Sequence, residues 1–300
     1  MDISSFVPSA KNLNNDSMQY FGLLGDYVGG VVGTVIGALT LIIVFFAWRV
    51  SKNSEYRSRT FQIFSEMVKT HEEIVSSLRV NTYMGRDAFV QLLSEFYAIY
   101  RMVCEEEKSC AIQELSIDEK IDVAYTFMYY GTQILTLSVL ENYDAAFIKA
   151  VADRLSSERQ SNKNHKRTYA GHQNRLSHYF RNIFGAYSFI ETSELAEAEK
   201  LALGKVLRTK LSNYEESLLA LNIISHLGRD WETSGLVGKF EPIKNIPIKF
   251  FTFDRSFHIK DRFPYVAFEW ENHGPKSVRV WKAKVGSFAF FMHRVVRRDL

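Results

Sequence analysis

An uncharged segment near the N-terminus limits what this chain can fold into. From Tyr27 to Trp48 there are 22 residues without a charge. A helix needs about 20 such residues to cross the hydrocarbon core of a bilayer. A signal peptide would have a basic start and a shorter apolar core, whereas the stretch from Met1 to Asp26 contains one lysine and three aspartates. We therefore predict a polar tail at residues 1–18 and a transmembrane anchor at 19–50, rather than a signal peptide or a buried core helix.

Four glycines recur at every fourth position around the start of this segment. They are Gly25, Gly29, Gly33 and Gly37, and on an α-helix this spacing places them along one side. Glycine is a poor helix former in water, but in lipid the backbone must satisfy its hydrogen bonds internally. A glycine face lets a second helix approach closely. We expect self-association through this face; packing against another part of the same chain, or easier tilting, is the alternative.

Basic residues flank the segment unevenly. Arg49, Lys52, Arg57 and Arg59 follow it, whereas Lys11 is the basic residue that precedes it. Cytoplasmic flanks of membrane helices carry the excess of lysine and arginine. The C-terminal bulk of the chain is therefore expected in the cytoplasm, with a single pass through the membrane.

Composition sets limits on the remaining part. About 250 residues follow the anchor, and a segment of this length can bury a substantial hydrophobic core. The net charge of +3 is too small to favour nucleic acid as a bulk partner. Cys104 and Cys110 have no matching His or Cys pair for zinc, and two cysteines suit a reducing compartment. We expect neither a metal nor a cofactor.

The spacing of apolar residues after the anchor is mostly helical. It predicts a cytoplasmic helical domain over residues 51–230. Ser116-x-x-Glu119 is a capping box that opens one of its helices. The expected helices cover residues 51–79, continuous with the anchor, 87–104, 116–140, 171–190 and 194–227. Residues 154–169 are expected as an exposed linker or a functional loop.

The last part of the chain has a different composition. Residues 231–300 are rich in aromatic side chains and contain several of the chain's prolines. They are predicted as an irregular or strand-containing extension. The fold class is therefore mainly α, with one N-terminal transmembrane helix, a helical bundle and a short irregular C-terminal region.

Two polar stripes provide the candidate site. Arg175, His178 and Asn182 step by three and four residues and share one helix face. A second stripe on the helix predicted at 194–227 contains Arg208, Ser212, Glu215, Asn222 and His226. If the stripes face one another, they build a buried network, either an active or ligand site with His178 as an acid or base, or a structural network that fixes helix register. The catalytic candidates are His178, Arg175, Asn182, Arg208 and Glu215.

The other sequence patterns give weaker support for a functional site. The aromatic cluster of Phe127, Tyr129 and Tyr130 is predicted to pack in the core or against another helix rather than to form a ligand cage. The chain contains no P-loop, no G-x-S-x-G and no H-E-x-x-H motif. No strong catalytic motif is present, so enzymatic activity stays an open question.

Several short motifs in the same order resemble the putative phage abortive infection family of bacteria. They are His178-Tyr-Phe-Arg-Asn182, Leu207-Arg-Thr-Lys-Leu-Ser212 with Tyr214-Glu215, and Asn222-Ile-Ile-Ser225 with Gly228, together with the upstream elements Gly25-Asp-Tyr-Val-Gly-Gly30 and Gly85-Arg-Asp-Ala-Phe89. The resemblance runs from about Phe21 to Phe240. It implies defence against phage by arresting or killing the infected cell, and it implies no specific catalytic residues.

We therefore expect an abortive infection protein in the bacterial inner membrane whose cytoplasmic domain senses infection or acts as effector. Its expected partners are the lipid bilayer, a second copy of the chain and a phage-derived trigger. One alternative is a membrane-tethered RNase of the HEPN class, because Arg167-x4-His172 and Arg159-x5-His165 fit that class's Arg-x4–6-His pattern. Another is a membrane scaffold or receptor without enzymatic activity that recruits a separate effector.

Overall fold

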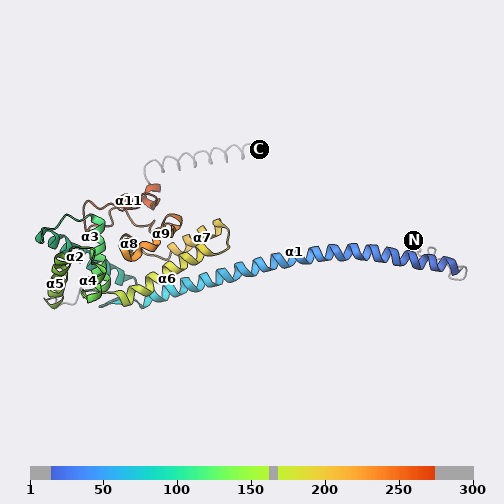
Figure 1. Cartoon of the computed structure of the whole chain (residues 1–300), viewed down its shortest axis with the longest axis horizontal. Helices are drawn as coiled ribbons and strands as arrows, with labels where there is room; N and C mark the ends of the chain where they lie inside the picture. The colour runs from blue at the N-terminus through green and yellow to red at the C-terminus, as the bar shows by residue number, and fades with distance from the viewer. Residues whose placement is uncertain (1–14, 162–167, 274–300) are drawn as a thin grey trace, which may run out of the picture. The chain divides into compact units, whose positions relative to one another are not determined.

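The computed structural model describes residues 15–161 and 168–273, and it confirms a mainly α-helical protein (Figure 1). Two short strands form the sheet found in these ranges, an antiparallel hairpin that pairs Arg79 with Met84 and Val80 with Tyr83. The elements are α1 (Asn15–Ser77), β1 (Arg79–Val80), β2 (Tyr83–Met84), α2 (Arg86–Ser109), α3 (Ile117–Tyr130), α4 (Ile134–Val139), α5 (Ala145–Ser161), α6 (Gln173–Thr192), α7 (Glu197–Arg208), α8 (Asn213–Ile224), η2 (His226–Gly228), α9 (Arg229–Thr233), α10 (Leu236–Phe240), α11 (Ile259–Arg262) and η3 (Glu269–His273).

Helix α1 contains the uncharged segment and continues beyond it without a break, as predicted. It is the one helix in the described ranges that is long and apolar enough to cross a membrane. The chain divides into two compact units between Gln62 and Ile63, inside this helix. In the first unit the apolar side chains of α1 are exposed, and the hydroxyls of Thr34 and Thr40 donate to carbonyls four residues earlier. The helix thus satisfies its own polar groups in this stretch.

The second unit, which begins at Ile63, is organised around α2. This helix packs against α3, α5 and α8. Phe89, Leu92, Phe96 and Ile99 are fully buried along it, because their spacing of three and four residues places them on one face. The start of α2 was predicted within one residue, and its end at Ser109 lies beyond the predicted end at Cys104.

Helix α3 begins at the predicted capping box, in which Ser116 accepts from Glu119 N. It ends at Tyr130 rather than at Leu140, so the single helix predicted over 116–140 is divided into α3 and α4. Gly131 follows with a φ of +75°, a left-handed conformation that glycine adopts without strain. A Cβ there would lie 2.7 Å from the backbone of Ala170, so glycine is required for the chain to pass this close.

The predicted single helix over residues 194–227 is also wrong. It is divided into α7, α8 and the short helix η2. The break lies at Ser212, whose extended backbone and side-chain oxygen cap α8 together with Glu215. Ser212-x-x-Glu215 is the same capping-box signal that opens α3, but the leucine spacing on either side concealed it.

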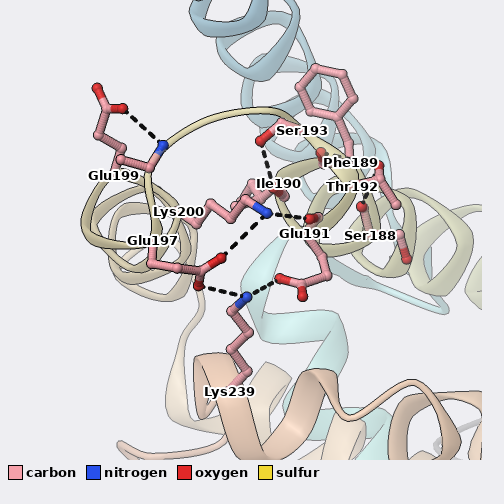
Figure 2. Close-up of polar contacts among 11 residues, drawn as sticks. Ser188, Phe189, Ile190, Glu191, Thr192, Ser193, Glu197, Glu199, Lys200 and Lys239 are labelled. Atoms are coloured by element: carbon pink, nitrogen blue, oxygen red, sulfur yellow. Dashed lines mark hydrogen bonds and ion pairs between the residues drawn. The ribbon is translucent and has the colours of Figure 1, made fainter.

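Charged side chains surround the connection from α6 to α7 (Figure 2). Lys200 donates from Nζ to the carbonyl of Glu191, with 2.6 Å between the atoms. Lys239, from α10, forms ion pairs with both Glu191 and Glu197. Ser193 closes the end of α6 by donating from Oγ to Ile190 O. These contacts join α6, α7 and α10.

One further prediction is corrected, and the predicted irregular C-terminal region is confirmed where the structure describes it. Residues 154–161, expected within a linker or loop, belong to α5, and 162–167 lie outside the described residues. Residues 241–273 form an irregular segment with two short helices and no strand. Phe251, Phe253 and Phe257 in this segment contact one another and join the core of the second unit. The remainder of the predicted extension, 274–300, lies outside the described residues.

Candidate functional site

The candidate catalytic residues on α6 do not form a buried network. Arg175 and His178 are exposed. Arg175 Nη1 lies 3.5 Å from His172 Nδ1. Asn182 is half-buried, and no described residue offers its Oδ1 a hydrogen bond. These side chains therefore share a helix, as predicted, without the predicted burial.

The second stripe is divided among several elements. Arg208, the last residue of α7, donates from Nη1 to the carbonyls of Phe240 and Glu241 at 2.9 and 3.2 Å. Ser212 caps α8, and His226 lies in η2. Glu215 is buried on α8. Within the described ranges, the two stripes do not form one network, because the hydrogen bonds of these side chains go to different elements.

Glu215 is paired instead with a histidine that the sequence analysis did not single out. His71, near the C-terminal end of α1, has 1% of its surface exposed, and its Nε2 lies 3.5 Å from Glu215 Oε1. The ring of Tyr179 packs against His71, with 5.4 Å between ring centroids. Burial, together with the nearby Glu215 carboxylate, raises the pKa of Tyr179 well above its usual range. Residues 71 and 215 thus form a buried imidazole–carboxylate pair, here called the His71–Glu215 pair.

The two oxygens of Glu215 have different surroundings. Oε2 accepts from the backbone N of Ser212 at 2.8 Å and from its Oγ at 2.6 Å, and it lies 3.6 Å from Arg86 Nε. The described residues offer no well-formed hydrogen bond to Oε1 or to either ring nitrogen of His71. A buried polar atom left without a partner costs roughly 1–3 kcal/mol. Each such atom in a folded protein needs an explanation, and a functional role is one of them.

An open cleft of 460 Å³ adjoins the pair. It lies beside the last turns of α1, the start of α2 and the end of α7, and the lining residues include His71, Gly85 and Lys210. Arg86 donates from Nη2 to Lys210 O at 3.0 Å, while Lys210 Nζ lies 2.8 Å from Glu72 Oε1. Lys210 lowers the pKa of Glu72. Two cations and a buried acid–base pair therefore meet at one cleft.

This arrangement can move a proton or form an ion pair. An imidazole beside a carboxylate is a common arrangement for general acid–base chemistry. The cleft lacks the serine–histidine or cysteine–histidine geometry of a nucleophilic site, because Ser76 Oγ donates to Glu73 O. In the described ranges no group of three or more His, Cys, Asp or Glu side chains could hold a metal ion.

A sequence signal for His71 did exist. The apolar residues of this part of α1 are Phe64, Met67, Val68, Ile74, Val75 and Leu78. His71 falls on the same face at the same spacing, so a histidine on an otherwise apolar face was visible. Its partner was not, because periodicity identifies a buried face but not the residue that packs against it.

The histidine of one predicted nuclease motif is also buried. His172 has 1% of its surface exposed, and its Nε2 lies 3.1 Å from Glu95 Oε1. Glu95 also accepts from the backbone N of Thr168 and Tyr169. The pair fastens the chain before α6 to α2, which does not suit a histidine that must reach RNA. Arg167 and His165 lie outside the described residues.

The comparisons with known proteins concern one segment of the chain. Residues 171–251 match the family model described as putative phage abortive infection protein. No curated protein and no solved structure matches the chain. The matched segment contains Lys210, Ser212 and Glu215, while His71 and Arg86 lie before it. Residues 171–251 are therefore similar to the putative phage abortive infection family, the family that the motifs of the chain resemble. This similarity supports a role in antiphage defence.

Proposed function

We propose that this protein is a membrane-anchored effector of abortive infection. The uncharged segment of α1 spans the bacterial inner membrane, and the second unit lies in the cytoplasm, where it responds to a phage-derived trigger. The anchors associate through the glycine face and perturb the membrane. A change in the helical unit reaches the anchor helix through the His71–Glu215 pair.

One observation carries the proposal: α1 contains both the uncharged segment and His71. His71 is buried beside Glu215, and Glu215 lies in the segment that matches the abortive infection family. A change that moves α8 or alters the charge of Glu215 therefore acts on the same helix that carries the glycines. This connection suits a protein that converts recognition in one unit into an effect of the other.

The character of residues 18–50 supports a lipid environment for this stretch. Large side chains such as Leu41, Ile43 and Phe46 are more than half exposed, and so large an apolar surface would be unfavourable in water. The hydroxyl bonds of Thr34 and Thr40 are those expected of a helix that must satisfy its polar groups internally. The basic residues after Trp48 support a cytoplasmic second unit.

The central test uses cells that carry the protein during phage infection, with membrane potential and RNA integrity measured together. The effector proposal expects loss of membrane potential while tRNA and mRNA stay intact. Gly33→Leu should abolish protection, because the side chain would block close approach of a second helix. Thr34→Leu is the matched control, since it places the same side chain at the neighbouring position on another side of the helix.

The outcomes separate the alternatives. Cleaved RNA with an intact membrane potential would replace the effector proposal with the RNase. Full protection by Gly33→Leu would favour a scaffold that recruits another protein. Recovery of the full-length chain in the soluble fraction without detergent would contradict the membrane anchor itself.

A second test examines the His71–Glu215 pair. His71→Leu should leave the helical unit folded, because Glu215 keeps its hydrogen bonds from Ser212 and its contact with Arg86, and a leucine has no buried polar atom to satisfy. The variant should nevertheless abolish protection. Glu215→Gln should also leave the unit folded and abolish protection. If the two residues act as a unit, the double variant should lose no more protection than either single variant. Circular dichroism and membrane fractionation verify the fold and location. Protection by a folded His71→Leu variant would remove the pair from the mechanism.

A further inference from the structure

A second cleft, of 370 Å³, lies among the end of α3, helix α6 and the turn from α8 to α9. It is separate from the His71–Glu215 pair and is here called the aromatic cleft. Its lining residues all belong to the family-matched segment except Tyr129 and Tyr130. Phe180 and Arg181 from the His178–Asn182 motif line it together with Asn222 and Gly228 from a later motif. Two motifs that are well separated in sequence therefore meet here.

Glycines allow the chain to form this cleft. A Cβ on Gly171 would lie 2.5 Å from the backbone of Tyr130, and His172 N donates to Tyr129 O at 2.8 Å. This contact holds the end of α3 against the start of α6. Across the cleft, a Cβ on Gly228 would lie 2.2 Å from Asn222 O. Since L-residues cannot approach so closely, both glycines are steric requirements.

Aromatic side chains contribute much of the lining, and their positions are supported by neighbouring rings. Tyr129 and Tyr130 meet edge to face with centroids 4.9 Å apart, and Phe184 meets Trp231 in the same way at 5.2 Å. Phe127, in the same predicted cluster, is buried, as expected. The two tyrosines are half-buried and line the cleft instead. Aromatic faces at an open cleft favour a planar ligand.

Polar groups accompany the rings. Gln173, Ser177 and Arg181 follow one another at intervals of four on α6 and all line the cleft. Arg181 donates from Nε to Ser177 O at 3.1 Å, which orients the guanidinium group. Neither Arg181 nor Asp230, which lines the cleft from α9, has an ion-pair partner in the described part of the chain. A cation is thus available beside the aromatic lining.

We propose that the aromatic cleft binds a nucleoside phosphate. The base would stack on the aromatic side chains, because such stacking tolerates any base. Arg181 would bind the phosphate, since guanidinium groups match phosphate oxygens in pairs. Asp230 and Gln173 provide acceptors for sugar hydroxyls or base amino groups. The volume lies near the lower end of the roughly 300–1,000 Å³ of small-molecule sites, so it suits one nucleotide unit. That unit is either a free mononucleotide or the phosphorylated end of an RNA.

The experiment uses the purified full-length chain in detergent and isothermal titration calorimetry. The probes are AMP, GMP, adenosine, inorganic phosphate and a short RNA with or without a 5′ phosphate. We expect saturable binding of AMP or GMP and much weaker binding of adenosine and of phosphate alone. If the 5′-phosphorylated RNA binds more tightly than the mononucleotides, the source is an RNA end; the reverse order indicates a free nucleotide.

Variants locate the binding. Arg181→Ala should weaken nucleotide binding about 10- to 100-fold, as expected for one lost charge-assisted contact, and Tyr130→Leu should weaken it about tenfold. Arg175→Ala is the matched control, because it removes the same charge from an exposed position on the same helix that does not line the cleft. Circular dichroism confirms folding of each variant.

Two results would overturn the assignment: no saturable binding of any nucleotide at millimolar concentration, or equal weakening by Arg181→Ala and Arg175→Ala. Binding is measured without phage or membrane potential. Failure here therefore leaves the membrane proposal standing, and failure of that proposal leaves this one testable.

Discussion

The two parts of α1 have similar apolar side chains in opposite surroundings. Phe45, in the first unit, has 53% of its surface exposed, whereas Phe64, further along the same helix, has 5%. Both parts are regular helix, so the backbone does not account for the difference. The second unit supplies partners such as α6, whose Tyr179 packs against His71, while the described part of the first unit supplies none. An apolar helix face therefore becomes a core only where other elements of the chain cover it.

Polar groups on α1 also differ between the two units. In the first unit, the hydroxyls of Thr34 and Thr40 bond to their own helix. In the second, the same helix presents His71 to Glu215, which lies far away in sequence. Local bonds satisfy a helix that stands alone, whereas long-range pairs connect helices that pack together. Matched changes in the two units should therefore differ in their effect on unfolding of the second unit in the full-length chain.

The largest difference is expected from removal of an aromatic ring. Phe96→Ala deletes a fully buried ring and should lower the free energy of unfolding of the second unit by about 3–5 kcal/mol. Phe45→Ala removes the same ring from an exposed position and should leave this free energy unchanged. Chemical denaturation followed by near-ultraviolet circular dichroism measures both. Equal effects would mean that Phe45 contributes to the stability of the second unit.

Adding a methyl group to a glycine should produce a smaller difference. Gly228→Ala places Cβ against the backbone of Asn222 and should destabilise the second unit by about 1–3 kcal/mol. Gly33→Ala should not, because a Cβ there meets no described atom within 4 Å. The same denaturation experiment compares them. A tolerated Gly228→Ala would show that the turn at η2 can move away from α8.

A pH titration separates the units through Glu216. Burial raises the pKa of this carboxyl to about 8, although Asn245 donates to it from the backbone N and from Nδ2. The folded chain then keeps a proton that the unfolded chain releases above about 4.5. The free energy of unfolding should therefore fall as the pH rises from about 4.5 to about 8. This group contributes a decrease of up to about 1.4 kcal/mol per pH unit.

Glu216→Gln should remove this part of the pH dependence, and denaturation at several pH values measures it. The stretch from Val28 to Trp48 contains no titratable side chain, so no comparable dependence should come from it. An unchanged slope in the variant would assign the pH dependence to another group.

The smallest effect is expected at the charged surface. Lys239→Ala removes ion pairs with Glu191 and Glu197 (Figure 2) and should cost less than about 1 kcal/mol, because partly exposed pairs are weak. Added salt should reduce the difference further. Lys52→Ala removes a cation near the ring of Trp48 in the first unit and should have no effect. A cost that persists in high salt would indicate that Lys239 contributes by packing.

The sequence predicted the helical elements well where their signals were local. The continuous α1, the capping box at Ser116 and helix α6 were found because each depends on neighbouring residues. The breaks at Gly131 and Ser212 were missed, since apolar spacing continues across both. Of the candidate site residues, Glu215 alone lies in the His71–Glu215 pair. Arg175 and His178 share the predicted face, but spacing did not reveal that this face is exposed.

The sequence by itself determined that the chain contains a long uncharged helix, that most of the remainder is helical, and which family its motifs resemble. These properties follow from composition and from spacing of three and four residues, which act over a few turns of one helix. The tertiary structure decided that His71 meets Glu215 and that Tyr130 lies beside the start of α6. These contacts depend on which helix faces pack together and on glycines that permit close backbone contact. The sequence of a single helix does not contain that information.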